Sequence, residues 1–185
     1  MKKLFTQTIF FIALATFAWV GCKKDDHDHD HEHEEITQLA MTFTPISGGG
    51  PVVFQFTDPD GLGPMEPVRV EPTLRSNTAY KVTLKVMGKD KDLTDQIKKE
   101  AETHQFFFIR VPQNFIAFSY QDNDKNNLPI GLVNHVQTFG ATRGVLTVVL
   151  RHELRKATAN LNETNYPMAG GSTDIEASFN VVVVD

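Results

Sequence analysis

The chain has 185 residues, a formal net charge of −5 and a single cysteine. This length suits one domain behind a short leader, and a single cysteine excludes a disulfide within the chain. Lys and Arg total 18 against 23 Asp and Glu, with no basic stripe, which excludes a nucleic-acid-binding protein.

The first 21 residues have the organisation of a secretory signal peptide. Lys2 and Lys3 give a positive start, Leu4–Val20 is mostly apolar, and Gly21 precedes Cys22. The apolar run is shorter than the roughly 20 residues of a membrane-spanning helix. The pattern resembles the lipobox of bacterial lipoproteins, which implies cleavage before Cys22 and attachment of acyl chains such as palmitate. Several acyl chains make a durable anchor; an ordinary signal peptide with an incidental cysteine is the alternative.

The segment from Cys22 to Glu35 is a polar tether. Between Lys23 and Glu35 it contains seven acids, two lysines and no apolar side chain, so we expect it to be flexible. Its first residues, Lys23–Asp26, resemble the lysine-then-acid signal that sends some Gram-negative lipoproteins to the outer face of the outer membrane. This resemblance implies display at the cell surface, with the periplasmic face as the alternative. The remainder, Ile36–Asp185, carries a net charge near −2 and is almost neutral.

Histidines and carboxylates alternate along this tether, which favours binding of a divalent transition metal. Neutral imidazole is a ligand of zinc, copper and nickel, and closely spaced histidines raise the effective concentration of the next ligand. The carboxylates can bind the metal through oxygen or orient the imidazole N–H groups. A solvated spacer without a metal role is the alternative. The predicted ligands are His27, His29, His31 and His33, with Asp28, Asp30, Glu32 and Glu34.

From Ile36 onward the chain shows the period-two alternation of β-strands, interrupted by Gly, Pro, Asn and Asp. Runs around Leu39–Phe43 and Val52–Phe56 flank a glycine-rich turn and predict a hairpin. A short strand follows at Val68–Val70. In Tyr80–Val86 apolar residues alternate with Lys and Thr, which predicts a strand with one face in water.

Lys89–Thr103 breaks this pattern, because its apolar residues recur every four positions and predict a short amphipathic helix. The next two runs, Gln105–Val111 and Asn114–Tyr120, are expected to form a second hairpin. A long polar loop is expected at Glu153–Thr173. The last predicted strands are Ile130–Phe139, Gly144–His152 and Asp174–Val184.

Eight or nine short strands with one helix predict an all-β fold. We expect an immunoglobulin-like antiparallel β-sandwich, with a small barrel as the alternative. The chain then divides into a signal peptide at 1–21, a lipidated cysteine with its tether at 22–35, and the sandwich domain at 36–185.

Five short motifs are spread over the predicted domain: FQFTDPDG at Phe54–Gly61, ETHQFFF at Glu102–Phe108, LPIGL at Leu128–Leu132, LRHE at Leu150–Glu153 and AGGSTDI at Ala169–Ile175. Together they resemble a family of small Gram-negative outer-membrane lipoproteins, often labelled the type 1 periplasmic binding fold superfamily. The label refers to a two-lobed α/β fold, whereas the strand pattern here predicts a sandwich. The resemblance therefore implies location rather than an activity.

Within the domain, two histidines at predicted element ends are candidate metal ligands. His104 precedes a strand and His152 ends one, so they can form a site with Glu102 or Glu153. The alternative is that both are polar surface or capping residues.

A polar loop offers a calcium hypothesis. Asp122, Asp124 and Asn126 have the ligand spacing of a calcium loop, but the later glycine and glutamate of the EF-hand pattern are absent. A β-turn with solvated side chains is the alternative.

The chain carries no nucleophile elbow, phosphate-binding glycine loop or HExxH motif, so we predict a binding protein and not an enzyme. The leading hypothesis is a surface lipoprotein that gathers zinc or another divalent transition metal and assists a TonB-dependent receptor or another surface protein. The alternative is a structural or adhesive sandwich that binds glycan or a surface protein through Glu153–Thr173, without a metal role.

Overall fold

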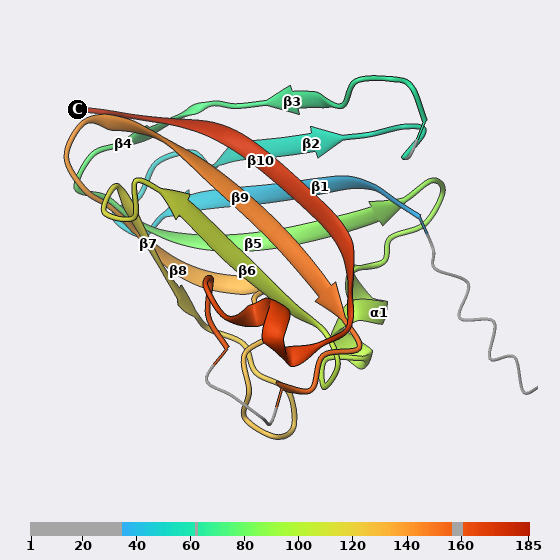
Figure 1. Cartoon of the computed structure of the whole chain (residues 1–185). Coiled ribbons are helices and arrows are strands. Elements are labelled where there is room, and N and C mark those ends of the chain that lie inside the picture. The colour runs from blue at the N-terminus through green and yellow to red at the C-terminus, as the bar shows by residue number, and fades with distance from the viewer. Residues whose placement is uncertain (1–34, 62, 157–160) are drawn as a thin grey trace, which may run out of the picture. The chain divides into compact units, whose positions relative to one another are not determined.

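Ten β-strands in two sheets make up most of the described part of the chain (Figure 1). The computed structural model describes residues 35–61, 63–156 and 161–185. The predicted all-β sandwich is confirmed, with ten strands in place of the expected eight or nine. No helix in the described ranges is long and apolar enough to cross a membrane. The predicted signal peptide, Cys22 and the histidines of the predicted tether lie outside these ranges.

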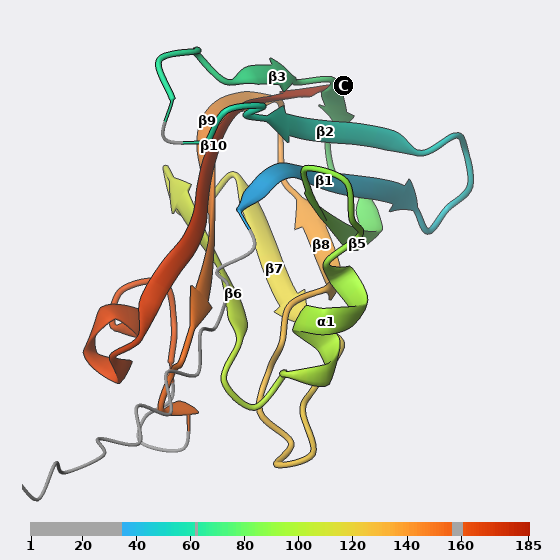
Figure 2. The same ribbon diagram turned by 90° about the vertical axis from the view of Figure 1, so that its right-hand side faces the viewer.

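The first sheet has six strands in the order β3-β2-β1-β5-β8-β7, and the second has four in the order β4-β10-β9-β6. All neighbours are antiparallel except β4 and β10, which run parallel. Figure 2 shows the two layers, with β9 and β10 in one and β1, β5 and β8 in the other. The first sheet comprises β1 (Ile36–Pro45), β2 (Val52–Thr57), β3 (Val68–Val70), β5 (Ala79–Gly88), β7 (Ile116–Tyr120) and β8 (Val133–Thr138). The second comprises β4 (Thr73–Arg75), β6 (Gln105–Val111), β9 (Thr142–His152) and β10 (Ser172–Val184).

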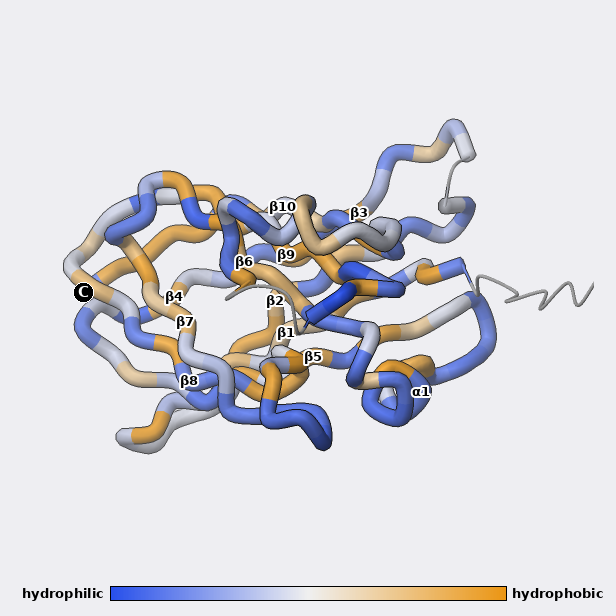
Figure 3. The backbone as a smooth tube through the Cα atoms, turned by 60° about the horizontal axis from the view of Figure 1, so that its bottom comes forward, coloured by the Kyte–Doolittle hydropathy of each residue, from blue (hydrophilic) through white to orange (hydrophobic). Residues whose placement is uncertain are grey.

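Alternation of apolar and polar side chains places the core between the sheets. In β5 the side chains of Tyr80, Val82, Leu84 and Val86 are buried, and the lysines and threonine between them are exposed. Strands β1 and β10 alternate in the same way, and Figure 3 shows hydrophobic residues concentrated along the strands. Each fully buried aliphatic or aromatic side chain stabilises the fold by about 1.5–3 kcal/mol relative to exposure.

The first predicted hairpin is confirmed and the second is wrong. Strands β1 and β2 pair in antiparallel register, but β6 pairs with β9 and β7 pairs with β8, in opposite sheets. The reason is that β6 is apolar on both faces. Phe106 and Phe108 enter the core between the sheets, whereas Phe107 lies in a separate cluster. Such a strand needs cover on both faces, and the first sheet covers the face that carries Phe106 and Phe108.

The cover on the outer side is the segment that follows β9. This predicted polar loop contains a 3-10 helix, η2 (Tyr166–Ala169), and the Tyr166 ring stacks on Phe107 with centroids 4.7 Å apart. Leu154 and Ala169 complete the buried cluster around Phe107. Gly171 has a φ of +73°, and a Cβ at this position would collide with the carbonyl oxygen of His152. Glycine therefore allows the chain to turn back tightly into β10.

The predicted helix within Lys89–Thr103 is confirmed in a shorter form as α1 (Thr94–Lys99). Its apolar residues Leu93, Ile97 and Ala101 are buried against the core. The Asp92 carboxylate accepts a hydrogen bond of 3.0 Å from the Thr94 N–H and so satisfies a free donor at the helix start. A short turn after this helix leads to His104, which immediately precedes β6.

Two charged side chains cover part of the edge of β10, where the short strand β4 does not reach. β4 pairs only with residues 182–184 of β10. Nearer the middle of β10, the Asn180 N–H donates to Glu71 Oε1 at 2.7 Å. The Arg69 Nε–H donates to the Ser178 carbonyl at 2.9 Å. Side chains thus satisfy backbone groups that a neighbouring strand would otherwise pair.

Candidate metal centre

His104 and His152 lie side by side at one end of the second sheet. His152 ends β9, and His104 immediately precedes β6, the strand paired with β9. Gln105 lies opposite Arg151 in an antiparallel register. The residue before Gln105, His104, therefore lies opposite the residue after Arg151, His152. Their imidazole rings stack with centroids 4.4 Å apart and an interplanar angle of 9°. The fold thus joins the two domain histidines that the sequence singled out.

The carboxylates beside this pair are Asp174 and Glu100. Asp174 Oδ2 lies 3.7 Å from His104 Nε2, and its Oδ1 lies 3.9 Å from His152 Nδ1. Asp174 stands where the register of β10 on β9 shifts between Thr173 and Ile175, and such a bulge redirects a side chain. Glu100 follows α1, and one ligand atom each from Glu100, His104 and His152 lie within 4.8 Å of one another.

The acids expected beside the histidines lie elsewhere. Glu102 forms an ion pair with Lys125, and Glu153 is exposed and has a φ of +58°. The four-residue spacing of Glu100 and His104 at a helix end was a signal available in the sequence. Asp174 could not be found without the register of β10, because it comes from a third segment.

Hydrogen bonding and burial prepare His104 as a neutral ligand. Its Nδ1 lies 3.0 Å from the Glu100 carbonyl oxygen, so Nδ1 carries the proton and donates, and Nε2 keeps its lone pair. Burial lowers the pKa of His104 below its usual value, and His152 lowers it further, against the opposing effects of the Glu100 carbonyl and Asp174. The ring is therefore neutral at pH 7. A backbone carbonyl that holds the second nitrogen is a common outer partner of a metal-bound histidine.

The distances suit a metal after a small adjustment. Ligand atoms about 2.1 Å from a tetrahedral zinc ion are separated by about 3.4 Å, and the His104 to Asp174 distance is 3.7 Å. The stacking adds a requirement, because imidazole lone pairs lie in the ring plane and two parallel rings cannot both point at one ion. One ring must turn out of the stack. The His152 side chain is 16% exposed against 6% for His104, so His152 is the ring with room to turn.

The predicted calcium loop is organised around a lysine ammonium. Lys156 Nζ lies 2.9 Å from Asp124 Oδ2, and both side chains are at most 2% exposed. The other Asp124 oxygen accepts from the N–H groups of Asn126 and Leu128, each at 2.9 Å. The two oxygens of Asp122 accept from the N–H groups of Gly131 and Leu132. Protein donors thus occupy the loop carboxylates, and Lys156 supplies the positive charge.

The same lysine holds the backbone of the histidine site. Its Nζ donates to the Ala101 carbonyl at 2.8 Å and to the His104 carbonyl at 3.2 Å. Burial lowers the pKa of Lys156, and the hydrogen bond with Asp124 opposes this effect. Burial alone would raise the pKa of Asp124, but hydrogen bonds from Lys156 and from Leu128 lower it below its usual value. The contact between the two groups thus favours the charged form of each. No pattern in the sequence pointed to this pair.

The chain enters the fold at the end of the sandwich that carries the histidines. Ile36 at the start of β1 pairs with Gly88 at the end of β5, next to the connection into α1. β6 begins and β9 finishes at this same end, as Figure 1 shows. The predicted tether ligands precede Ile36 in sequence and lie outside the described residues. Comparison with protein-family models, curated proteins and solved structures gives no match to this chain.

Proposed function

We propose that this chain is a lipid-anchored outer-membrane binding protein that takes up a divalent transition metal, with zinc as the first candidate. The signal-peptide pattern before Cys22 supports the anchor, and the tether histidines support a loose first capture of metal. The domain adds a second site made of His104 and His152 with Glu100 or Asp174. In this proposal the protein works by binding and does not catalyse a reaction.

One observation carries the metal proposal. The imidazoles of His104 and His152 lie in contact beside the carboxylates of Glu100 and Asp174. The imidazole of His104 is buried, neutral and oriented by a backbone carbonyl. Ionisable side chains gathered in a partly buried place, with a shifted pKa at His104, are a common feature of functional sites. Zinc, copper and nickel all accept imidazole and carboxylate ligands, whereas magnesium and calcium prefer oxygen.

Zinc titration of the mature chain at pH 7.5 tests the proposal. Four proteins are compared by calorimetry: the wild type, His152→Gln, a variant with the four tether histidines changed to alanine, and the control His135→Gln. His135 is an exposed histidine on β8, in the first sheet, and belongs to neither set of predicted ligands. We expect His152→Gln to lose one tight equivalent, the tether variant to lose weaker uptake, and His135→Gln to bind as the wild type. Equal zinc binding by the wild type and His152→Gln would remove the domain site from the proposal.

The location and partner are tested separately. We expect mass spectrometry of the native protein to find acyl chains on Cys22, and protease added to intact cells to digest the domain. A soluble, unacylated N terminus would contradict the anchor.

For the partner, we propose a TonB-dependent receptor or another surface protein, which supports uptake of the metal gathered by the tether. Cross-linking in intact membranes, with a Cys22→Ala form as the control, tests this association.

A further inference from the structure

A pocket lies between the two sheets on the side where β6 and β7 form their edges. Side chains bridge these two edge strands. Arg110 Nη1 on β6 donates to the Ile116 carbonyl on β7 at 3.1 Å. In the middle, the rings of Phe108 and Phe118 stack with centroids 4.2 Å apart. The sandwich is thus closed on this side by side chains and not by a backbone ladder, which leaves space for a small molecule.

The segment Leu161–Thr164, here called the strap, forms the outer wall of this pocket. Glu163 fixes it, because Arg110 Nε donates to Glu163 Oε2 at 3.0 Å and Nη2 donates to Oε1 at 2.8 Å. Gln113 also donates to Glu163 at 3.2 Å. The pocket between strap and strands has a volume of about 330 Å³. This is the lower end of the range for small-molecule sites and fits one or two rings.

The charges of the pocket cancel, which selects against charged ligands. Arg110 and Glu163 form a two-pronged ion pair whose side chains are 20% and 17% exposed. An anion would have to displace Glu163 from Arg110, and a cation would have to displace Arg110 from Glu163. Burial raises the pKa of Tyr120 to about 12, so this phenol also stays neutral. A ligand without net charge is therefore the best match.

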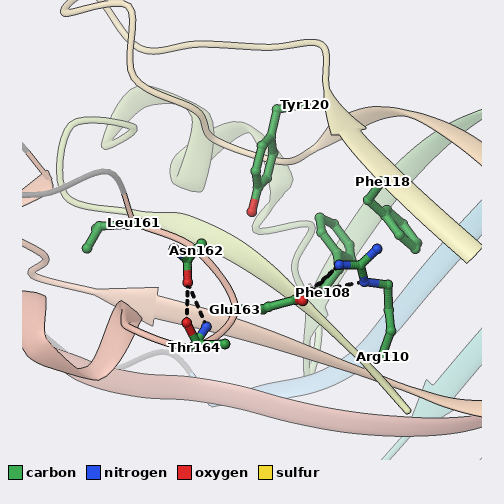
Figure 4. A pocket seen from close by; sticks show the side chains of 8 residues that line it. All are labelled: Phe108, Arg110, Phe118, Tyr120, Leu161, Asn162, Glu163 and Thr164. Carbon is green, nitrogen blue, oxygen red and sulfur yellow. Dashed lines mark hydrogen bonds and ion pairs between the residues drawn. The ribbon is translucent and has the colours of Figure 1, made fainter. Parts of the chain in front are cut away.

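The two walls of the pocket differ in chemistry, as Figure 4 shows. One wall is aromatic and includes Phe118 and Tyr120, both partly exposed. The other is the strap, with the polar side chains of Asn162 and Thr164. Asn162 Oδ1 accepts from the Thr164 N–H at 2.8 Å and the Thr164 hydroxyl at 2.7 Å. These bonds fix the orientation of the amide, so its Nδ2 hydrogens are the part that a ligand can use.

We propose that this pocket binds a neutral pyranose sugar, either free or as a terminal unit of a glycan. A pyranose has a flat face of C–H groups that packs on an aromatic ring and a rim of hydroxyl groups that pair with amide and hydroxyl groups. The pocket offers these two surfaces on opposite walls, with no free charge and with room for one or two rings. This site is separate from the histidine centre and does not depend on metal.

Saturation-transfer NMR and calorimetry on the mature chain test the proposal with glucose, galactose, mannose and N-acetylglucosamine as probes. Glucuronate serves as the charged counterpart. We expect at least one neutral sugar to bind and to receive saturation from aromatic protons, and glucuronate to bind more weakly. Absence of binding by all four neutral sugars, or tighter binding of glucuronate, would overturn the proposal.

Two variants locate the site. Phe118→Ala removes an aromatic surface, and Asn162→Ala removes the exposed amide of the strap. Each is expected to weaken sugar binding by about threefold to tenfold. Phe139→Ala is the matched control, because Phe139 is 44% exposed in the connection between β8 and β9. Unchanged affinity in Asn162→Ala and in a folded Phe118→Ala would show that sugar binds elsewhere and would overturn the assignment.

Discussion

The buried pair of Lys156 and Asp124 gives the sharpest prediction of stability. Replacing Lys156 with methionine keeps an unbranched apolar side chain as far as the ε position but removes the ammonium. Asp124 Oδ2 then loses its cation in a place where the Asp124 side chain is 1% exposed, and the carbonyls of Ala101 and His104 lose a donor. Removing one partner of a buried ion pair costs about 3–5 kcal/mol. That is a large share of the roughly 5–15 kcal/mol that keeps a domain folded.

Urea unfolding at pH 7, followed by circular dichroism, measures this loss. The matched control is Lys125→Met, because Lys125 is 75% exposed in its ion pair with Glu102. Such a surface pair contributes about 0–1 kcal/mol. The double variant Lys156→Met with Asp124→Asn removes the stranded charge as well, so it should be less destabilised than the sum of the two single variants.

The reasoning would be refuted if Lys156→Met lost less than about 1 kcal/mol, or no more than Lys125→Met. Strict additivity of the Lys156 and Asp124 effects would also contradict the coupling that their contact implies. Either result would mean that water reaches the pair in solution, and that the lysine does not hold the His104 backbone.

Three further predictions concern His104, Asp174 and Phe107. Because the pKa of His104 is lower in the folded protein than its usual value, the unfolded chain takes up this proton at a higher pH than the folded protein does. The free energy of unfolding should therefore rise with pH through about 6.5, and His104→Gln should flatten this rise in urea titrations from pH 5 to 7.5. Asp174→Asn should weaken zinc binding about 10-fold or more by calorimetry, and a change below about twofold would remove this carboxylate from the site. Phe107→Ala should cost about 3–5 kcal/mol in urea unfolding, because the ring is fully buried under Tyr166. A loss no larger than that of Phe139→Ala would contradict the buried cluster.

The sandwich could be predicted from the sequence because most of its strands have one buried face. Alternation in β1, β2 and β5 is regular, and the turn between β1 and β2 is short and glycine-rich. The prediction failed where alternation ends. The run Phe106–Phe108 has no polar face, so its pattern does not indicate which strand pairs with β6. Proximity in sequence favours β7, whereas the structure pairs β6 with β9. The strand β4 has only three residues and one buried side chain, Leu74, which is too short for a pattern to emerge.

The candidate metal centre was half predictable. His104 and His152 could be singled out because each stands at the end of a strand-like run, and the pairing of β6 with β9 brings them together. The adjacent carboxylates could not be chosen, because Glu153 is next to His152 in sequence but lies outside the cluster, whereas Asp174 comes from another strand. The calcium spacing of Asp122 and Asp124 was equally ambiguous, since a lysine distant in sequence can supply positive charge in place of a metal ion.

Arg69 and Glu71 have a consequence for the association of one copy of this protein with another. In the proposed membrane-anchored form, copies of the protein meet at high local density, and an unpaired part of the β10 edge would pair with a strand of the next copy. The two charged side chains already hold the N–H of Asn180 and the carbonyl of Ser178. A strand from another copy must first break these two hydrogen bonds before it can pair with this part of β10. The two charged side chains therefore act against edge-to-edge association of neighbouring copies.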